Sequence, residues 1–292
     1  MKVVIIHHKP PYHLDDYLAV SLLLQKYSSD DVTRITARRV DLNNISVSLE
    51  EGIISGELVI DGKEVNVSDF DKVIIVDIGR KLIVSQHTKP YFAVYDHHQD
   101  INVPSSLVLV LKNEFPELWR KIMKSEKLRK IVEYLDVRDR FGPRRANEIL
   151  GITDPFNVLK YIPMILMFEP SAEVGKNFIS LIESFSKVEE NVNVYEIQNL
   201  RVAVTDNHPR ELPAAVIFDV TGADIVVQPN SRNPNQTSII KNSESPRYND
   251  IDLTKLKSRY SVTFIHPNGF LAVIAKPVIA IDVNDIIKTL IQ

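Results

Sequence analysis

The chain has 292 residues, 44% of them hydrophobic and 25% charged, which is the composition of an ordinary globular protein large enough for two domains. It contains no cysteine, which excludes disulfides, thiolate metal sites and cysteine nucleophiles, so a metal ion would need nitrogen and oxygen ligands. The net charge of −3 argues against a protein that coats nucleic acid by bulk attraction.

Apolar segments are short throughout the chain. The first, residues 3–6, is too brief for a signal peptide, and none approaches the ~20 residues needed to cross a membrane. We therefore expect a cytoplasmic protein with no membrane partner.

Three short apolar runs in the first hundred residues are typical of buried strands. They cover residues 3–6, 72–76 and 91–95, and each ends directly in histidine or aspartate. In an open parallel sheet the strand ends of one polarity share an edge, and ligands bind outside the carboxyl ends. We therefore expect one metal-binding cluster built from His8, His13, Asp15, Asp77, Asp96, His97 and His98.

The remaining elements follow in chain order. The pattern predicts an apolar helix over 14–25, a strand over 32–37, and a hairpin off the sheet over 57–65 with an Asp61-Gly62 turn. Helices are predicted over 117–123, 126–138, 156–167 and 172–190. Strand-like runs follow over 200–204, 214–218, 225–227, 238–240, 262–265 and 271–274, with a terminal helix from Val283 and a polar surface loop over 229–250.

These elements predict an α/β protein. Residues 1–170 would form an N-terminal domain with a mainly parallel sheet flanked by helices. Residues 171–193 would form a connector helix, and residues 194–292 a smaller C-terminal α/β domain that holds substrate.

The residues after the first strand also have structural explanations. A lone histidine is more often a surface or satisfied core residue than a ligand, but His7, His8 and His13 cluster between one strand and one helix. Acids in the first turn of a helix favour its dipole and cap its N–H groups. Asp15 stands two residues from His13, which favours a ligand, whereas for Asp16 the two explanations weigh equally.

A purely structural role explains Asp77 more easily than it explains the residues that follow the next strand. Asp77 could begin a turn with Gly79. Asp96, His97 and His98 are three consecutive titratable groups at the end of a buried strand, with a large desolvation cost unless they are paired or bind metal. The set as a whole indicates a metal-dependent hydrolase.

A basic segment lies between residues 120 and 145, with ten lysines and arginines against four acids. Taken alone, it is better explained as a solvated helix face followed by a loop. A groove that contacts phosphates would have the same composition, and the segment adjoins Asp136, another candidate ligand.

These motifs resemble those of the DHH phosphoesterase superfamily, which includes RecJ-type nucleases, nano-RNases, cyclic-dinucleotide phosphodiesterases and family II pyrophosphatases. The Myg-type branch is the most similar in its motifs. The resemblance rests on His8-x4-His13-Leu14-Asp15-Asp16, Asp77, Tyr95-Asp96-His97-His98-Gln99, the segment 133–139 and His266-Pro267-Asn268-Gly269-Phe270.

The resemblance implies two metal ions that share Asp77. His8, His13 and Asp77 would hold one, and Asp15, Asp77, His97 and Asp136 the other, with Asp139 as the alternative late ligand. Mixed imidazole and carboxylate donors suit Mn²⁺, and Mg²⁺ less well. In the catalytic set, His98 would contact a phosphate oxygen, Asp96 would orient a histidine ring, and Asp16 would assist.

The leading hypothesis is a Mn²⁺-dependent nuclease, an exonuclease, acting on single-stranded nucleic acid. By analogy with RecJ-like members we favour DNA, a role in repair or replication, and a helicase or similar protein as partner. The predicted substrate contacts are Arg138, Arg140, Arg144, Arg232, His266, Asn268 and Gly269. The alternatives are a phosphodiesterase of short oligonucleotides or cyclic dinucleotides, an RNA exonuclease, and a DHH scaffold protein without catalysis.

Overall fold

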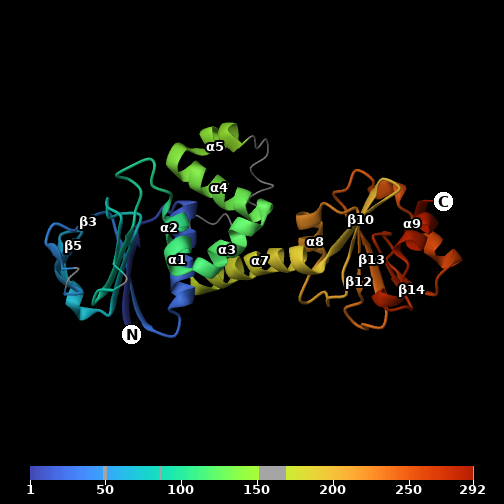
Figure 1. Ribbon diagram of the computed structural model, residues 1–292, viewed down its shortest axis with the longest axis horizontal. Coiled ribbons are helices and arrows are strands. Elements are labelled where there is room, and N and C mark those ends of the chain that lie inside the picture. The colour runs from blue at the N-terminus through green and yellow to red at the C-terminus, as the bar shows by residue number, and fades with distance from the viewer. Residues whose placement is uncertain (49–50, 86, 151–168, 292) are drawn as a thin grey trace. The chain divides into compact units, whose positions relative to one another are not determined.

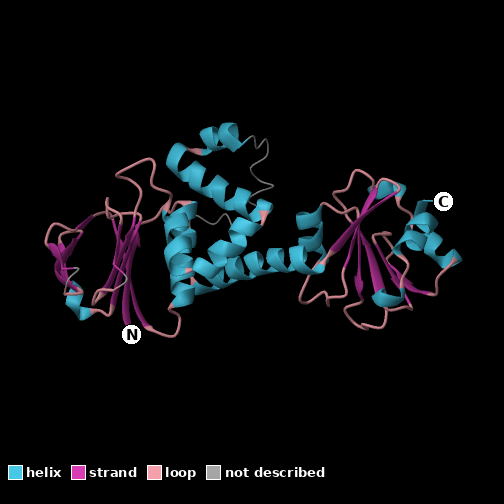
Figure 2. Cartoon of the chain, viewed as in Figure 1, coloured by secondary structure: helices cyan, strands magenta, loops and turns pink. Residues whose placement is uncertain are grey.

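The computed structural model describes residues 1–48, 51–85, 87–150 and 169–291. The chain divides into two compact units, Met1–Ile182 and Glu183–Gln292. Both contain helices and strands, so the predicted α/β class is confirmed (Figures 1 and 2). The helix predicted over 156–167 lies outside the described residues. No described helix has the length and apolar character needed to cross a membrane.

A five-stranded sheet organises the first unit. Its order is β2 (Asp31–Ala37), β1 (Lys2–His8), β7 (Lys72–Val76), β9 (Tyr91–Tyr95) and β8 (Ile83–Ser85). The first four strands are parallel and β8 is antiparallel. The three strands predicted from their apolar runs are therefore confirmed as parallel neighbours, and their carboxyl ends share one edge of the sheet.

Both faces of this sheet are covered, which is why its central strands are apolar at nearly every position. On one face Val3 and Ile5 pack with α1 (Leu14–Lys26) and α2 (Ser106–Glu114). On the other face Val4 and Ile6 pack with residues of a small second sheet. Figure 1 shows α1 and α2 on one side of the main sheet and β3 and β5 on the other.

The second sheet contains the predicted hairpin. It consists of β3 (Val40–Asp41), β4 (Ile45–Ser48), β5 (Ile53–Ile60) and β6 (Lys63–Asn66), followed by the short helix η1 (Val67–Asp69). Strands β5 and β6 are joined by Asp61 and Gly62, with φ of 47° and 85°. Positive φ at both positions is what a two-residue Asp-Gly hairpin turn requires.

Among its described residues the first unit also contains α3 (Pro116–Lys124), α4 (Glu126–Phe141) and α5 (Pro143–Leu150). Helix α4 begins where the Ser125 side chain accepts the N–H of Leu128, and it ends at Gly142, where φ is 82°. A glycine adopts this backbone conformation without steric cost. The cap and the glycine give α4 its length and therefore decide which residues its last turns present.

The second unit contains a six-stranded sheet. Its order is β10 (Asn193–Ile197), β11 (Leu200–Val204), β12 (Ile225–Pro229), β13 (Thr237–Lys241), β15 (Leu271–Ile274) and β14 (Val262–Ile265). Only the β11–β12 pair of this sheet is parallel. The unit also contains α8 (Ala214–Thr221), α9 (Val283–Ile291) and the short helices η2 (Tyr248–Asp250), η3 (Leu253–Ser258) and η4 (Val278–Ala280).

Two predictions for this part of the chain were wrong. Residues 214–218 are helical and not a strand, because Pro213 precedes a helix that Gly222 ends with φ of 66°. A short apolar run cannot distinguish a strand from a helix turn by periodicity alone. The predicted loop over 229–250 contains β13 and η2.

Helix α7 (Ala172–Asn191) overlaps the predicted connector, and the division between the two units falls within it. Near its start, Gly175 lies so close to α1 that a Cβ atom there would be 2.2 Å from the carbonyl oxygen of Ser21. Near its end, Val188 packs in the second unit with Ala203 and Leu212. One continuous helix thus contributes to the packing of each unit.

The end of α2 carries a buried carboxylate that stabilises the first unit. Glu114 accepts hydrogen bonds from Tyr27 (2.9 Å), Tyr95 (2.8 Å), Lys26 (2.5 Å) and Tyr91. Burial alone would raise the pKa of Glu114, but the hydrogen bonds from Lys26 and Tyr91 hold it below its usual value. The ionised side chain therefore ties α1 and β9 to α2.

We expect Glu114→Gln to lower the free energy of unfolding by about 2 kcal/mol, because hydrogen bonds to a buried charge are lost. A depressed carboxyl pKa stabilises the fold above the unfolded value of about 4.3, and this contribution disappears as the pH falls through the folded pKa. Denaturant unfolding at several pH values should therefore show the deficit near neutrality and not in acid. Glu117→Gln, which alters an exposed pair with Arg120, is the control and should change little.

Candidate metal centre

The predicted strand ends meet at the carboxyl edge of the main sheet. One ligand atom from each of Asp15, Asp77, His97 and Asp139 lies within 4.8 Å of the others. A second group with the same spacing consists of Asp77, His97 and His98. The two groups share Asp77 and His97, so two neighbouring ions would share these ligands.

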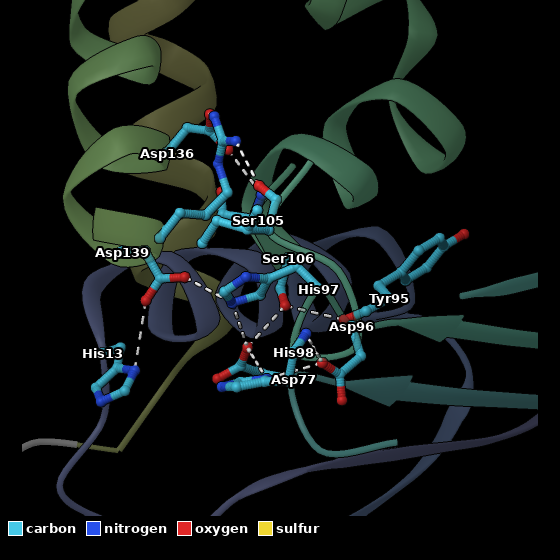
Figure 3. Close-up of polar contacts among 12 residues, drawn as sticks. His13, Asp77, Tyr95, Asp96, His97, His98, Ser105, Ser106, Asp136 and Asp139 are labelled. Carbon is cyan, nitrogen blue, oxygen red and sulfur yellow. Dashed lines mark hydrogen bonds and ion pairs between the residues drawn. The ribbon is translucent and has the colours of Figure 1, made fainter. Parts of the chain in front are cut away.

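The His97 ring lies between two carboxylates (Figure 3). Its Nε2 atom is 2.7 Å from Oδ2 of Asp139 and 3.4 Å from Oδ1 of Asp77. Burial alone would lower the pKa of His97, but these contacts raise it to about 10. Burial would likewise raise the pKa of Asp139, whereas His13 and His97 hold it well below its usual range. The centre is thus a dense cluster of opposite charges.

Asp77 is held in an unusual backbone conformation. Its φ is 64°, in the left-handed region that few residues other than glycine, asparagine and aspartate adopt. Its N–H donates to the carbonyl of Tyr95 at 3.0 Å, and the Ser106 hydroxyl lies 3.1 Å from its Oδ1 atom. These contacts from β9 and α2 fix the direction of the carboxylate.

Asp96 supports the centre without belonging to either ligand group. Its Oδ1 atom accepts both the backbone N–H and the Nδ1 atom of His98, each at 2.8 Å. Its Oδ2 atom accepts the N–H of Arg80 at 2.6 Å. Burial would raise the pKa of Asp96, but the contacts with His98 keep it lowered. Asp96 therefore orients the His98 ring.

Two carboxylates at the start of α1 are buried. Among the residues that the structure describes, none forms a hydrogen bond to the side-chain oxygens of Asp15 and Asp16. Burial, together with the charge of Asp77, raises the pKa of both well above the usual value. A bound cation would relieve this cost, and the imidazole and carboxylate donors around it suit a divalent ion. The residues present therefore fit a metal centre.

Of the two candidates for the late ligand, Asp139 belongs to a group with metal-ligand spacing and Asp136 does not. Asp136 has other partners: its Oδ1 atom accepts the N–H of Ser105 at 2.7 Å, and its Oδ2 atom pairs with Arg140. Figure 3 shows Asp136 turned towards Ser105 and Asp139 turned towards His97. One turn along α4 thus separates a residue that joins the cluster from one that anchors the helix to the loop before α2.

His8 and His13 lie beside this cluster but belong to neither four-atom nor three-atom group. Their rings are stacked with centroids 6.3 Å apart. His13 Nδ1 is 3.4 Å from Oδ1 of Asp139. Both histidines line a pocket of about 380 Å³ together with Asp77 and His98. Of the predicted metal ligands, the structure therefore brings all except Asp136 to one region.

Of the three arginines predicted to contact phosphate in the first unit, one lies near the cluster and two lie beside acidic residues. Arg138 lines a smaller pocket with His13, Asp15 and Asp139. Arg140, in contrast, pairs with Asp136 and donates to the Ile101 carbonyl at 3.0 Å. Arg144 is exposed and lies 3.4 Å from Glu148. Arg140 thus has a structural role.

The other predicted contacts lie in the second unit. His266 Nδ1 accepts the N–H of Asn268 at 3.2 Å, and its ring centroid is 4.2 Å from that of Phe270. Gly269 has φ of 67° in the same turn. Through these contacts the His266 side chain caps the turn before Phe270. Arg232 is exposed, and its N–H donates to Asn230.

Other residues at the centre were missed from the sequence. Arg38, Arg39, Arg80 and Lys81 line the pocket that contains the histidines. They follow β2 and β7, so the strand-end reasoning that found Asp77 could have found them. No comparable signal marks Ser106, whose contact with Asp77 depends on how α2 packs.

Comparison with known proteins gives weak similarities. No family model matches the chain, and no curated protein sequence matches it. Three solved structures are similar over most of their length, each at 12% identity. An uncharacterized protein from Helicobacter pylori covers 94% of this chain and 93% of its own, with a TM-score of 0.28.

The other two structures are similar at a TM-score of 0.24 each. An exopolyphosphatase-related protein from Bacteroides fragilis covers 99% of this chain and 89% of its own. A putative family II inorganic pyrophosphatase from Methanococcus jannaschii covers 100% of both. With scores and identities this low, none of the three assigns an activity to the chain.

Proposed function

We propose that this chain is a metal-dependent phosphodiesterase that hydrolyses single-stranded nucleic acid, with Mn²⁺ as the preferred ion. The observation that carries the proposal is the buried group of Asp15, Asp77, His97 and Asp139, whose ligand atoms lie within 4.8 Å of one another. Imidazoles and carboxylates in such a group suit Mn²⁺ better than Mg²⁺.

The residues have distinct roles in this proposal. Divalent cations bound at the cluster would supply an activated water at neutral pH and would offset charge on the leaving oxygen. Asp77, fixed by Tyr95 and Ser106, holds the position shared by both ligand groups. His98 has a side chain 45% exposed and is oriented by Asp96, so it can donate to a phosphate oxygen.

A specific observation favours short substrates as a second candidate. Several cations of the basic segment pair with nearby acids on the same helices, as Arg120 does with Glu117 and Lys130 with Glu126. Arg145 pairs in the same way with Glu148. Cations without an acidic partner among the described residues line the 380 Å³ pocket beside the centre, a volume suited to a small ligand. This arrangement favours substrates of a few nucleotides.

A substrate-length series tests the proposal and separates the candidates. We expect Mn²⁺-dependent hydrolysis of 5′-labelled single strands, from a dinucleotide to oligomers longer than the ~16 nucleotides that a single-strand-binding fold covers. DNA and RNA versions, each with Mn²⁺, Mg²⁺ or chelator, should be compared by kcat/KM. Rates that rise with length support a processive nuclease, and rates highest for the shortest strands support the second candidate. No hydrolysis with either ion would instead support the scaffold alternative.

A further inference from the structure

Four cations line the pocket beside the metal centre. Arg38 and Arg39 follow β2 directly, and Arg80 and Lys81 follow Asp77 within four residues. The same pocket is lined by His8, His13, Asp77, Asp96 and His98. All four cationic side chains are exposed, and each stands beyond the carboxyl end of a parallel strand, the edge where ligands bind in such sheets.

The loop that carries Arg80 and Lys81 is tightly held. Arg80 has φ of 52°, and its N–H donates to Asp96 at 2.6 Å. At Gly79 a Cβ atom would lie 2.3 Å from Cγ1 of Val94, so only glycine allows this close approach. Asp96 therefore orients His98 with one oxygen and holds the backbone of Arg80 with the other.

Arg38 and Arg39 are held from the second sheet. The Asp61 carboxylate, in the β5–β6 turn, accepts the backbone N–H of Arg38 at 2.9 Å and of Arg39 at 3.1 Å. Its other oxygen pairs with Lys9 at 2.5 Å. The hairpin that the sequence predicted as an excursion off the sheet thus holds the backbone of two arginines that line the pocket beside the metal centre.

These cations have no charged partner among the residues that the structure describes. Asp41 also lines the pocket, but its carboxylate accepts the N–H of Asn43 at 2.9 Å. By comparison, Arg144 and Arg145 on α5 both lie near Glu148. Four like charges that face one pocket repel one another, and an anion bound there would relieve this repulsion.

We propose that this group of four is a phosphate subsite, which binds the phosphate next to the one being hydrolysed. The inference rests on the proposed phosphodiesterase function and names its substrate: a strand with a second phosphate group one nucleotide from the cleaved bond. Guanidinium groups bind phosphate oxygens in a bidentate manner, and Lys81 adds a point charge. The second phosphate is either a neighbouring diester or a terminal monoester.

The test compares three substrates of the full-length protein with Mn²⁺: a dinucleotide, the same dinucleotide with a 5′-phosphate, and a trinucleotide without one. The wild type should prefer the two that carry a second phosphate. In Arg80→Gln/Lys81→Gln the KM for these two should rise by about 10- to 100-fold, and the preference should shrink. A rise for the 5′-phosphorylated dinucleotide alone assigns the subsite to a terminal monoester, and a rise for both assigns it to any neighbouring phosphate.

A matched control and a binding measurement keep the two proposals separate. Lys2→Gln/Lys89→Gln removes the same charge near the opposite ends of β1 and β9 and should leave all three KM values unchanged. Affinity for the 5′-phosphorylated dinucleotide is also measured in an Asp77→Asn background, where turnover is not needed. If neither affinity nor preference falls in the double variant, the subsite is wrong while wild-type turnover still supports the phosphodiesterase. If the wild type shows no turnover but the Arg80→Gln/Lys81→Gln substitutions still lower the affinity, the phosphate subsite is supported and the proposed phosphodiesterase activity is wrong.

Discussion

Asp77→Asn is expected to abolish Mn²⁺-dependent hydrolysis while the protein stays folded. Asp77 belongs to both possible ligand groups, so loss of its charge weakens the binding of either ion. The contribution of such an ion to transition-state stabilisation is several kcal/mol, and we expect kcat to fall by at least about 1,000-fold. Asparagine suits this position because it tolerates the φ of 64° that alanine would adopt only with strain.

The measurement combines turnover, metal content after dialysis and thermal unfolding. Asp69→Asn is the matched control, because Asp69 is exposed in η1 just before β7 while Asp77 follows the same strand. The control should retain activity and metal. A folded Asp77→Asn protein with wild-type turnover would show that this residue does not hold a catalytic ion.

Asp139→Asn and Asp136→Asn should affect different properties of the protein. The first should affect metal binding and turnover, and the second should affect stability. Asp139 contacts His97 at 2.7 Å, so its loss should reduce metal content. We expect kcat to fall by at least about 100-fold, because losing a residue that only supports a metal ligand already lowers activity by up to about 100-fold. Asp136 pairs with Arg140 and accepts the N–H of Ser105. Its replacement should leave metal content unchanged and lower the free energy of unfolding by about 1–3 kcal/mol.

The pair is informative because the two aspartates lie one turn apart on α4 and receive the same substitution. Metal content and denaturant unfolding measured on both variants give a two-by-two comparison. If Asp136→Asn loses metal and Asp139→Asn does not, the geometric assignment is reversed. If both lose metal, α4 contributes two carboxylates to the centre.

The sequence alone determined the strand ends of the candidate metal centre. The runs before Asp77 and Asp96 are apolar at nearly every position because both faces of the sheet are covered, and such runs are visible locally. Parallel pairing then brings their carboxyl ends to one edge whatever the details of packing, so Asp77 and His97 could be placed together without coordinates.

Local chemistry was less decisive where two structures fit the same pattern. The apolar run 214–218 fits a strand or a helix, and only the flanking Pro213 and Gly222 favour the helix that forms. The basic segment fits a phosphate groove or a solvated helix face. In the structure Lys130 pairs with Glu126 four residues earlier on the same helix, as on a solvated helix face.

Only the tertiary structure decided which face of α4 meets the metal centre and what holds the cations beside it. Asp136 and Asp139 are three residues apart, so either could point inward, and the rotation of the helix is set by buried side chains such as Leu135. Likewise, Asp61 and Arg38 are 23 residues apart, and their contact exists because the second sheet packs on the first. Periodicity and strand order are properties of short segments, whereas helix rotation and long-range carboxylate contacts depend on how those segments pack.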